Sequence, residues 1–118
     1  MHLVPAERAH RRIIDEEKVC EAIEGLADEA VVQTWARRFA LLGDLTRLRL
    51  LVCIYVAGPI SVSDLAVAVD LHEDTVSQTL RFLRANQTVA TERDGRVIRY
   101  RLADTVIRQL LDQVTANR

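Results

Sequence analysis

The sequence predicts a mainly α-helical fold with a small β-hairpin, in the α+β class, from three observations. Apolar residues recur at helical spacing before residue 57 and after residue 102. Residues 61–85 contain two short helical patterns separated by a tight turn. Residues 88–102 alternate in polarity, favour β-structure and hold Asp94-Gly95 at their centre. This order is that of a winged helix-turn-helix, and 118 residues suffice for one such domain.

The N-terminal part predicts an arm followed by two helices. Residues 1–14 hold a proline and a cluster of arginines, and we expect a mobile arm there. Acidic residues from Asp15 onward suit a helix start, which predicts a helix over 15–27. A second helix is predicted over 30–42, ended by Gly43. Its apolar stripe consists of Val31, Trp35, Phe39 and Leu42.

A third helix is predicted from Thr46 to about Val56. Asp44 can cap its start, and Gly58-Pro59 breaks it. Its core, LRLLVCIYV, is apolar nearly all round, so this helix should lie at the centre of the fold.

The next two helices form the predicted helix-turn-helix. Ser61 and Asp64 make a capping-box-like pair at the start of the first helix. Residues 70–72 make the turn, and the second helix runs over 73–85. Its inward residues are predicted to be Val76, Leu80 and Leu83.

The wing and a last helix complete the prediction. Strands are expected over 88–93 and 96–102, with Asp94-Gly95 as the turn between them. A helix follows over 103–116. Its predicted inward residues are Val106, Leu110, Leu111 and Val114.

Composition and charge narrow the class of protein. No apolar run approaches the ~18 residues of a membrane span, and the N-terminal residues lack the apolar core of a signal peptide, so we expect no membrane partner and a cytoplasmic location. The two cysteines, Cys20 and Cys53, should therefore be free thiols. The net charge is −1, yet residues 73–101 carry six arginines against four carboxylates. Residues 15–30 carry seven carboxylates against a single lysine.

The second helix of the helix-turn-helix and the wing carry polar and arginine side chains of the kinds that contact DNA in other proteins. Glutamine can pair with adenine, arginine with guanine, and small hydroxyl side chains with either base or phosphate. We therefore expect the chain to bind double-stranded DNA. The candidate DNA-binding residues are Thr75, Ser77, Gln78, Thr79 and Arg81 on the helix and Arg93 and Arg96 at the wing tip.

The outer helices favour a homodimer over a monomer that buries them in its own core. The stripes over 30–42 and 103–116 are apolar surfaces that a small winged helix cannot cover alone. We expect residues 15–118 to form one winged helix-turn-helix domain whose outer helices dimerise. Two copies on a two-fold axis would match a palindromic operator.

The chain resembles the ArsR/SmtB family of bacterial winged-helix repressors. The resemblance rests on LGDLTRLRLL (42–51), SVSDLAVAVDLHEDTVSQTLRFLR (61–84) and GRVIRYRLAD (95–104), and covers about residues 30–116. It implies a homodimer that represses an operon and releases a palindromic operator when an effector, such as a metal ion, binds.

The effector positions that the resemblance implies are where this sequence departs from the family. Ser61 and Ser63 replace the cysteines of one family site, and Val106 replaces a histidine of another, where Asp104 remains. Ala9 and Ile13 stand where N-terminal cysteines occur in cadmium- and lead-sensing members. A divalent transition or soft metal would need other ligands. The candidates that remain are Cys20, His10, His2 and Cys53.

Three alternatives to a metal-gated repressor are an enzyme, a differently gated regulator and a protein-interaction module. The sequence has no P-loop, no GxSxG and no HExxH motif, so it is not expected to be an enzyme. A winged-helix regulator gated by thiol oxidation, or not gated at all, stays open. So does a protein-interaction module built on the same fold.

Overall fold

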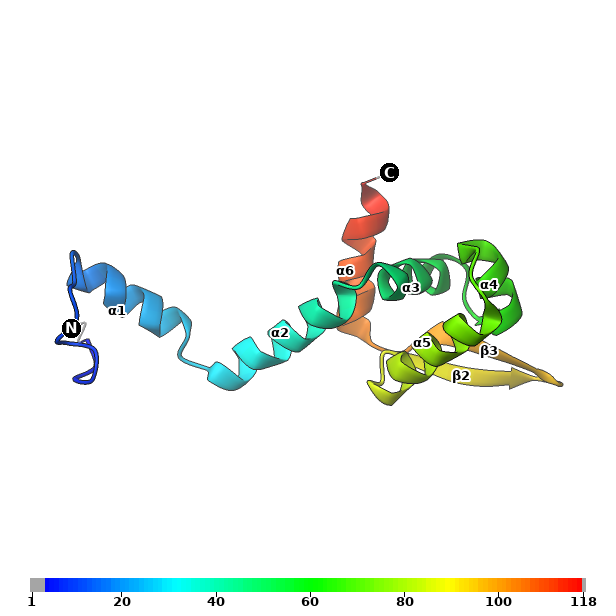
Figure 1. Cartoon of the computed structure of the whole chain (residues 1–118), viewed down its shortest axis with the longest axis horizontal. Helices are drawn as coiled ribbons and strands as arrows, with labels where there is room; N and C mark the ends of the chain where they lie inside the picture. Colours follow the sequence, from blue (N-terminus) through cyan, green and yellow to red (C-terminus); the bar gives the residue numbers. More distant parts are fainter. Residues whose placement is uncertain (1–3, 118) are drawn as a thin grey trace. The chain divides into compact units, whose positions relative to one another are not determined.

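The computed structural model describes residues 4–117, and they contain six helices and a three-stranded sheet (Figure 1). Residues 38–117 form one compact unit, and the residues before them form a smaller one. The elements are α1 (Glu16–Gly25), α2 (Glu29–Leu42), α3 (Leu45–Ala57), β1 (Ile60–Ser61), α4 (Val62–Val69), α5 (Glu73–Ala85), β2 (Val89–Asp94), β3 (Val97–Leu102) and α6 (Thr105–Ala116). This confirms the mainly α-helical winged helix-turn-helix. Within the described residues, no helix is long and apolar enough to cross a membrane.

The sheet is antiparallel, with the order β1-β3-β2. The two-residue strand β1, which pairs Ile60 with Tyr100, was not predicted because two residues show no periodicity. The hairpin turn also differs by one residue from the prediction. Asp94 pairs with Val97, so Gly95 and Arg96 make the turn, and Gly95 takes a φ of 63° that suits glycine.

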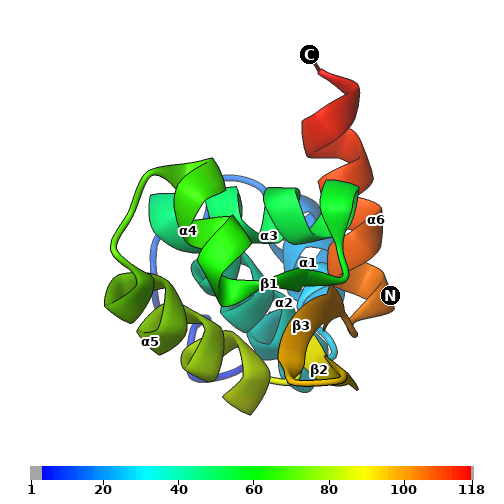
Figure 2. The same ribbon diagram turned by 90° about the vertical axis from the view of Figure 1, so that its right-hand side faces the viewer.

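The hydrophobic core lies around α3, as its apolar sequence predicts. Leu50, Leu51 and Ile54 of this helix are buried. The helix contacts α4, α5, α6 and β3, and Figure 2 shows α4 and α5 on one side of it and α6 on the other. The other buried apolar residues of this core are Leu65, Ala66, Val69, Val76, Leu80, Leu83, Val89, Leu102, Ile107 and Leu111.

Side-chain caps set the helix starts that the sequence predicts. The carboxylate of Asp44 accepts from the Arg47 amide at 2.9 Å, and the Ser61 hydroxyl accepts from the Asp64 amide at 3.2 Å. These bonds satisfy amides that have no partner inside the helix. Because caps are local, α4 begins directly after Ser61 as predicted, and α3 begins at Leu45, one residue before the predicted Thr46.

The inward face of α6 corrects a prediction. Ile107 and Leu111 are the buried residues of this helix, whereas Val114 is 44% exposed and Val106 and Leu110 are half-buried. Asp104 caps the helix through the amides of residues 106 and 107. The helix thus starts two residues later than predicted and turns Ile107 towards the core.

Candidate nucleic-acid interface

Helix α5 exposes three of its five candidate DNA-binding residues on the side away from its core contacts. Val76, Leu80 and Leu83 are completely buried, which fixes the rotation of the helix. Positions 75, 78 and 81 then face away from the core, whereas positions 77 and 79 lie at its edge. Among the candidates on α5, Thr75, Gln78 and Arg81 are exposed, and Ser77 and Thr79 are half-buried.

The hydroxyl of Thr79 is already engaged within the helix. It donates to the carbonyl oxygen of Thr75 at 2.9 Å. Its single proton is therefore used, and only its oxygen can still accept. Thr79 is for this reason a weaker candidate than Gln78, whose amide can both donate and accept.

The start of α5 combines two opposite electrostatic effects. His72 occupies the N-cap position without a side-chain hydrogen bond to the first turn, so the first amides keep their donors. Such amides attract phosphate. Glu73 and Asp74 lie in the same turn and repel it. The N-terminus of α5 is therefore a less favourable phosphate-binding site than the wing.

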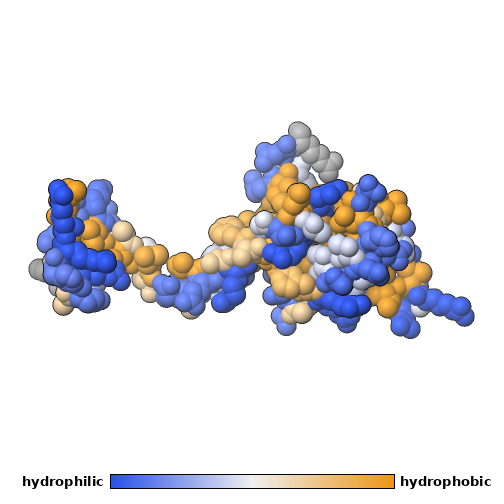
Figure 3. Space-filling model, in the orientation of Figure 1, coloured by the Kyte–Doolittle hydropathy of each residue, from blue (hydrophilic) through white to orange (hydrophobic). Residues whose placement is uncertain are grey.

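The wing presents two arginines whose charge is not neutralised within the described residues. Arg99 lies 3.6 Å from the carboxylate of Asp94, and Arg101 lies 3.5 Å from that of Glu92. The carboxylates of the wing are thus taken by arginines of β3. In residues 4–117, neither Arg93 nor Arg96 makes an ion pair, and both are exposed. Figure 3 shows hydrophilic side chains, in blue, projecting from the end of the wing.

A hollow of about 350 Å³ lies between the first turn of α3 and one face of α5. Sequence reasoning missed the α3 side of this hollow. Its signal was the D-L-T-R stretch over 44–47, which places a hydroxyl and a guanidinium in the first turn of a capped helix. The residues that line the hollow are Asp44, Thr46, Arg47, Thr75, Gln78, Thr79 and Phe82.

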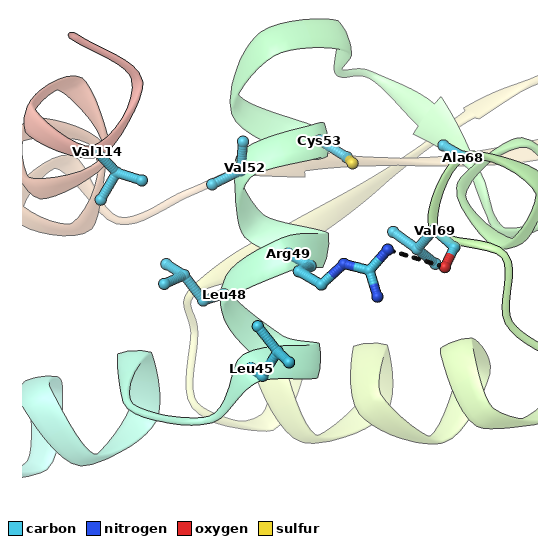
Figure 4. A pocket seen from close by; sticks show the side chains of 8 residues that line it. All are labelled: Leu45, Leu48, Arg49, Val52, Cys53, Ala68, Val69 and Val114. Carbon is cyan, nitrogen blue, oxygen red and sulfur yellow. Dashed lines mark hydrogen bonds between the residues drawn. The ribbon is translucent and has the colours of Figure 1, made fainter. Parts of the chain in front are cut away.

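A second hollow, of about 340 Å³, is almost entirely apolar (Figure 4). It lies along α3, with walls from α4 and α6. The sulfur of Cys53 points from α3 towards the side where Ala68 and Val69 lie, and Arg49 donates to the Val69 carbonyl at 3.1 Å. The half-buried Cys53 is thus set among hydrocarbon side chains, the usual surroundings of a structural cysteine.

Of the metal-ligand candidates, Cys20 and His10 belong to the N-terminal unit and Cys53 to the larger one. Within residues 4–117, no three His, Cys, Asp or Glu side chains are grouped so that they could hold a metal ion. His10 is exposed, and His2 lies outside the described residues. Cys20 is buried, and this burial raises the pKa of its thiol, with Glu16 and Glu24 adding to the effect. A raised pKa disfavours the thiolate that a metal requires.

The arrangement of helix-turn-helix, wing and central α3 is that of the winged-helix transcriptional regulators. Solved structures confirm this: the repressor BigR from Xylella fastidiosa aligns with a TM-score of 0.63 and 32% identity, over 81% of this chain and 92% of that one. The cadmium metal-sensor CmtR from Mycobacterium tuberculosis aligns with a TM-score of 0.57 and 35% identity, over 66% and 80%.

Sequence comparison gives the family. A transcriptional repressor SmtB homolog from Synechocystis sp. is 38% identical over 82 residues, which are 70% of this chain and 61% of that protein. No family model matches the sequence. The chain belongs to the ArsR/SmtB family of winged-helix transcriptional repressors, whose members are regulators and not enzymes. It spans about half to three fifths of the length of the curated relatives it matches.

Proposed function

We propose that this chain is a sequence-specific DNA-binding transcriptional repressor. The observation that carries the proposal is the pairing of an outward polar face on α5 with two unneutralised arginines at the wing tip. A helix with such a face fits the major groove, and cations on a protruding hairpin reach the neighbouring backbone. Membership of a repressor family favours the same function.

The two parts of the interface have different roles in this proposal. Gln78 and Arg81 read base edges, adenine and guanine respectively, with Thr75, Ser77 and Thr79 as adaptable neighbours. Arg93 and Arg96 bind phosphate or the minor groove, and they supply affinity that does not depend on sequence.

We propose that the active form is a homodimer. Val31 and Val32 of α2 are 50% and 38% exposed, and Val114 of α6 is 44% exposed. Figure 3 shows apolar side chains reaching the surface along α2. A second copy that covers these side chains would place two α5 helices on a two-fold axis and so require a palindromic operator.

We propose a chemical class for the effector, a metal or metalloid, and no particular ion. Among similar proteins of known structure, CmtR is a cadmium metal-sensor and AntR is an antimony-specific transcriptional repressor, which makes a metal or metalloid the class to test first. The described residues contain no preformed group of three His, Cys, Asp or Glu ligands, so a metal site would have to form when the ion binds. Cys20 with His10 or His2, with or without Cys53, remains the candidate ligand set, and oxidation of a thiol is the alternative.

The test is selection of duplexes from a random library by the purified protein, followed by electrophoretic shifts. A palindromic consensus is expected. Gln78→Ala should cost about 1–3 kcal/mol on the selected duplex and relax preference at one position of each half-site. Arg96→Ala should weaken all duplexes alike and reduce the salt dependence by about one phosphate contact per wing.

Two outcomes would decide against the proposal. Recovery of sequences without any consensus would remove sequence-specific repression. Unchanged DNA binding after joint replacement of Ser77, Gln78, Arg93 and Arg96 by alanine would favour a protein-interaction module. Shifts repeated with Zn²⁺, Cd²⁺, Ni²⁺, arsenite or an oxidant then identify the effector by release of the duplex.

A further inference from the structure

Arg47, in the first turn of α3, donates hydrogen bonds to the C-terminal end of α2. Its Nε donates to the carbonyl of Leu41, and its Nη2 donates to the carbonyl of Ala40, both at 2.9 Å. These carbonyls belong to the last turn of α2, where no further helical amide can reach them. The guanidinium therefore serves as a side-chain cap for α2, and charge makes both bonds stronger than neutral ones.

The same guanidinium also contacts the recognition helix. Its central carbon lies 4.9 Å from the ring centroid of Phe82 on α5, which is cation–π distance. Phe82 stands one helical turn after Gln78, and both line the hollow that faces α3. One side chain thus joins the end of α2, the start of α3 and the outer face of α5.

We propose that Arg47 is a positioning residue that holds the reading face of α5 in register with the end of α2. This inference rests on the proposed DNA-binding function and adds a residue to it. If α2 contributes to the dimer, the distance between the two α5 helices depends on how each α5 is fixed to its own α2. Arg47 is a direct link of this kind, and it sets the placement of Gln78 without touching a base.

The geometry requires arginine rather than any cation. A planar guanidinium can donate two parallel bonds to the carbonyls while its face rests on the ring. A lysine keeps the charge but offers no flat face and no fixed pair of donors. Arg47→Lys therefore separates positioning from simple attraction to phosphate.

The experiment measures dissociation constants on two duplexes of equal length, one selected by the wild-type protein and one of random sequence, over a range of salt. Arg47→Lys and Phe82→Leu are each expected to weaken the selected duplex by about tenfold, the order of one charge-assisted bond with its ring contact. Binding to the random duplex and the salt slope should stay unchanged. The double variant should lose little more than the worse single one, because both changes break the same contact.

Arg108→Lys is the matched control. Arg108 lies over the ring of Tyr55 at 5.8 Å, on α6 and away from α5, so its replacement should leave both duplexes unaffected. Far-UV circular dichroism establishes that each variant is folded. If Arg47→Lys does not fold, Phe82→Leu still tests the contact, because it leaves the α2 cap intact.

Two results would overturn the inference. Wild-type affinity in both Arg47→Lys and Phe82→Leu would show that the contact positions nothing. An Arg47→Gln variant that loses about one unit of salt slope on both duplexes would make Arg47 a direct phosphate contact instead. Failure of the wild-type protein to select any duplex would count against the proposed function, which is a separate result.

Discussion

The unit of residues 38–117 and the segment of residues 4–37 use similar sequence patterns with different results. In the larger unit, apolar stripes from four helices and the sheet meet in one buried core. In α1 the only buried side chain is Cys20, and the part of α2 that belongs to this segment, residues 29–37, buries none. Helical spacing of apolar residues therefore predicts that a helix forms, but not that the same chain covers its stripe.

The difference indicates two roles for the apolar residues. Those around α3 hold the fold together, because removing them leaves a cavity. Val31 and Val32 of α2 remain accessible in a single chain, and exposed apolar surface of this kind is typical of an interaction site. Substitutions around α3 should therefore lower the free energy of unfolding, and substitutions along α2 should weaken association between copies.

The largest effect is expected for a core substitution in the larger unit. Leu50→Ala removes a completely buried side chain and should lower the free energy of unfolding by about 3 kcal/mol. Val19→Ala, at a half-buried position of α1, should cost less than about 1 kcal/mol. Urea denaturation followed by circular dichroism measures both, and equal losses would remove the distinction between the two regions.

A charge placed on α2 should act on assembly and not on folding. Val31→Asp would bury an unpaired carboxylate in the proposed dimer and should weaken association by about 100-fold. Val67→Asp, at an 82% exposed position of α4, is the control and should leave the dimer intact. Sedimentation equilibrium decides between them. A dimeric Val31→Asp protein would show that α2 lies outside the interface.

The same contrast explains how far the sequence could predict the structure. Local signals sufficed for the helix starts, because Asp44 and Ser61 cap the amides three residues ahead. The hairpin turn was placed one residue early because Asp94-Gly95 and Gly95-Arg96 both contain the glycine that a tight turn needs. Only the strand register distinguishes these two turns.

Contacts between distant residues could not be predicted in the same way. Arg47 and Phe82 are 35 positions apart, and neither periodicity nor capping couples them. Val76, Leu80 and Leu83 fix the rotation of α5, which leaves three of its five candidate DNA-binding residues exposed and the other two half-buried. Their contact with bases remains a prediction, as do the metal ligands.

Cys20 offers a smaller and chemically specific test in the N-terminal segment. Burial first, and then Glu16 and Glu24, raise the pKa of this thiol above its ordinary value of 9.0. In a Cys53→Ser variant, iodoacetamide should therefore alkylate Cys20 several-fold more slowly at neutral pH than it alkylates a cysteine in an unstructured peptide. Replacing both glutamates by glutamine should recover part of the rate. Alkylation as fast as in the peptide would mean that the thiol is not buried.

The smallest effect concerns one hydrogen bond inside the larger unit. The Tyr55 hydroxyl on α3 donates to the Asp112 carboxylate on α6, and this bond, followed by burial, raises the pKa of Tyr55 above its ordinary value of 10.0. The folded chain thus holds this proton more tightly than the unfolded chain does. The stabilisation is complete below pH 10.0 and is lost as the pH rises through the higher pKa of the folded state. Tyr55→Phe, which keeps the ring beneath Arg108, should lower the thermal midpoint at neutral pH, and the difference from wild type should shrink in the alkaline range. A difference that stays constant through that range would mean that the hydroxyl contributes nothing through this bond.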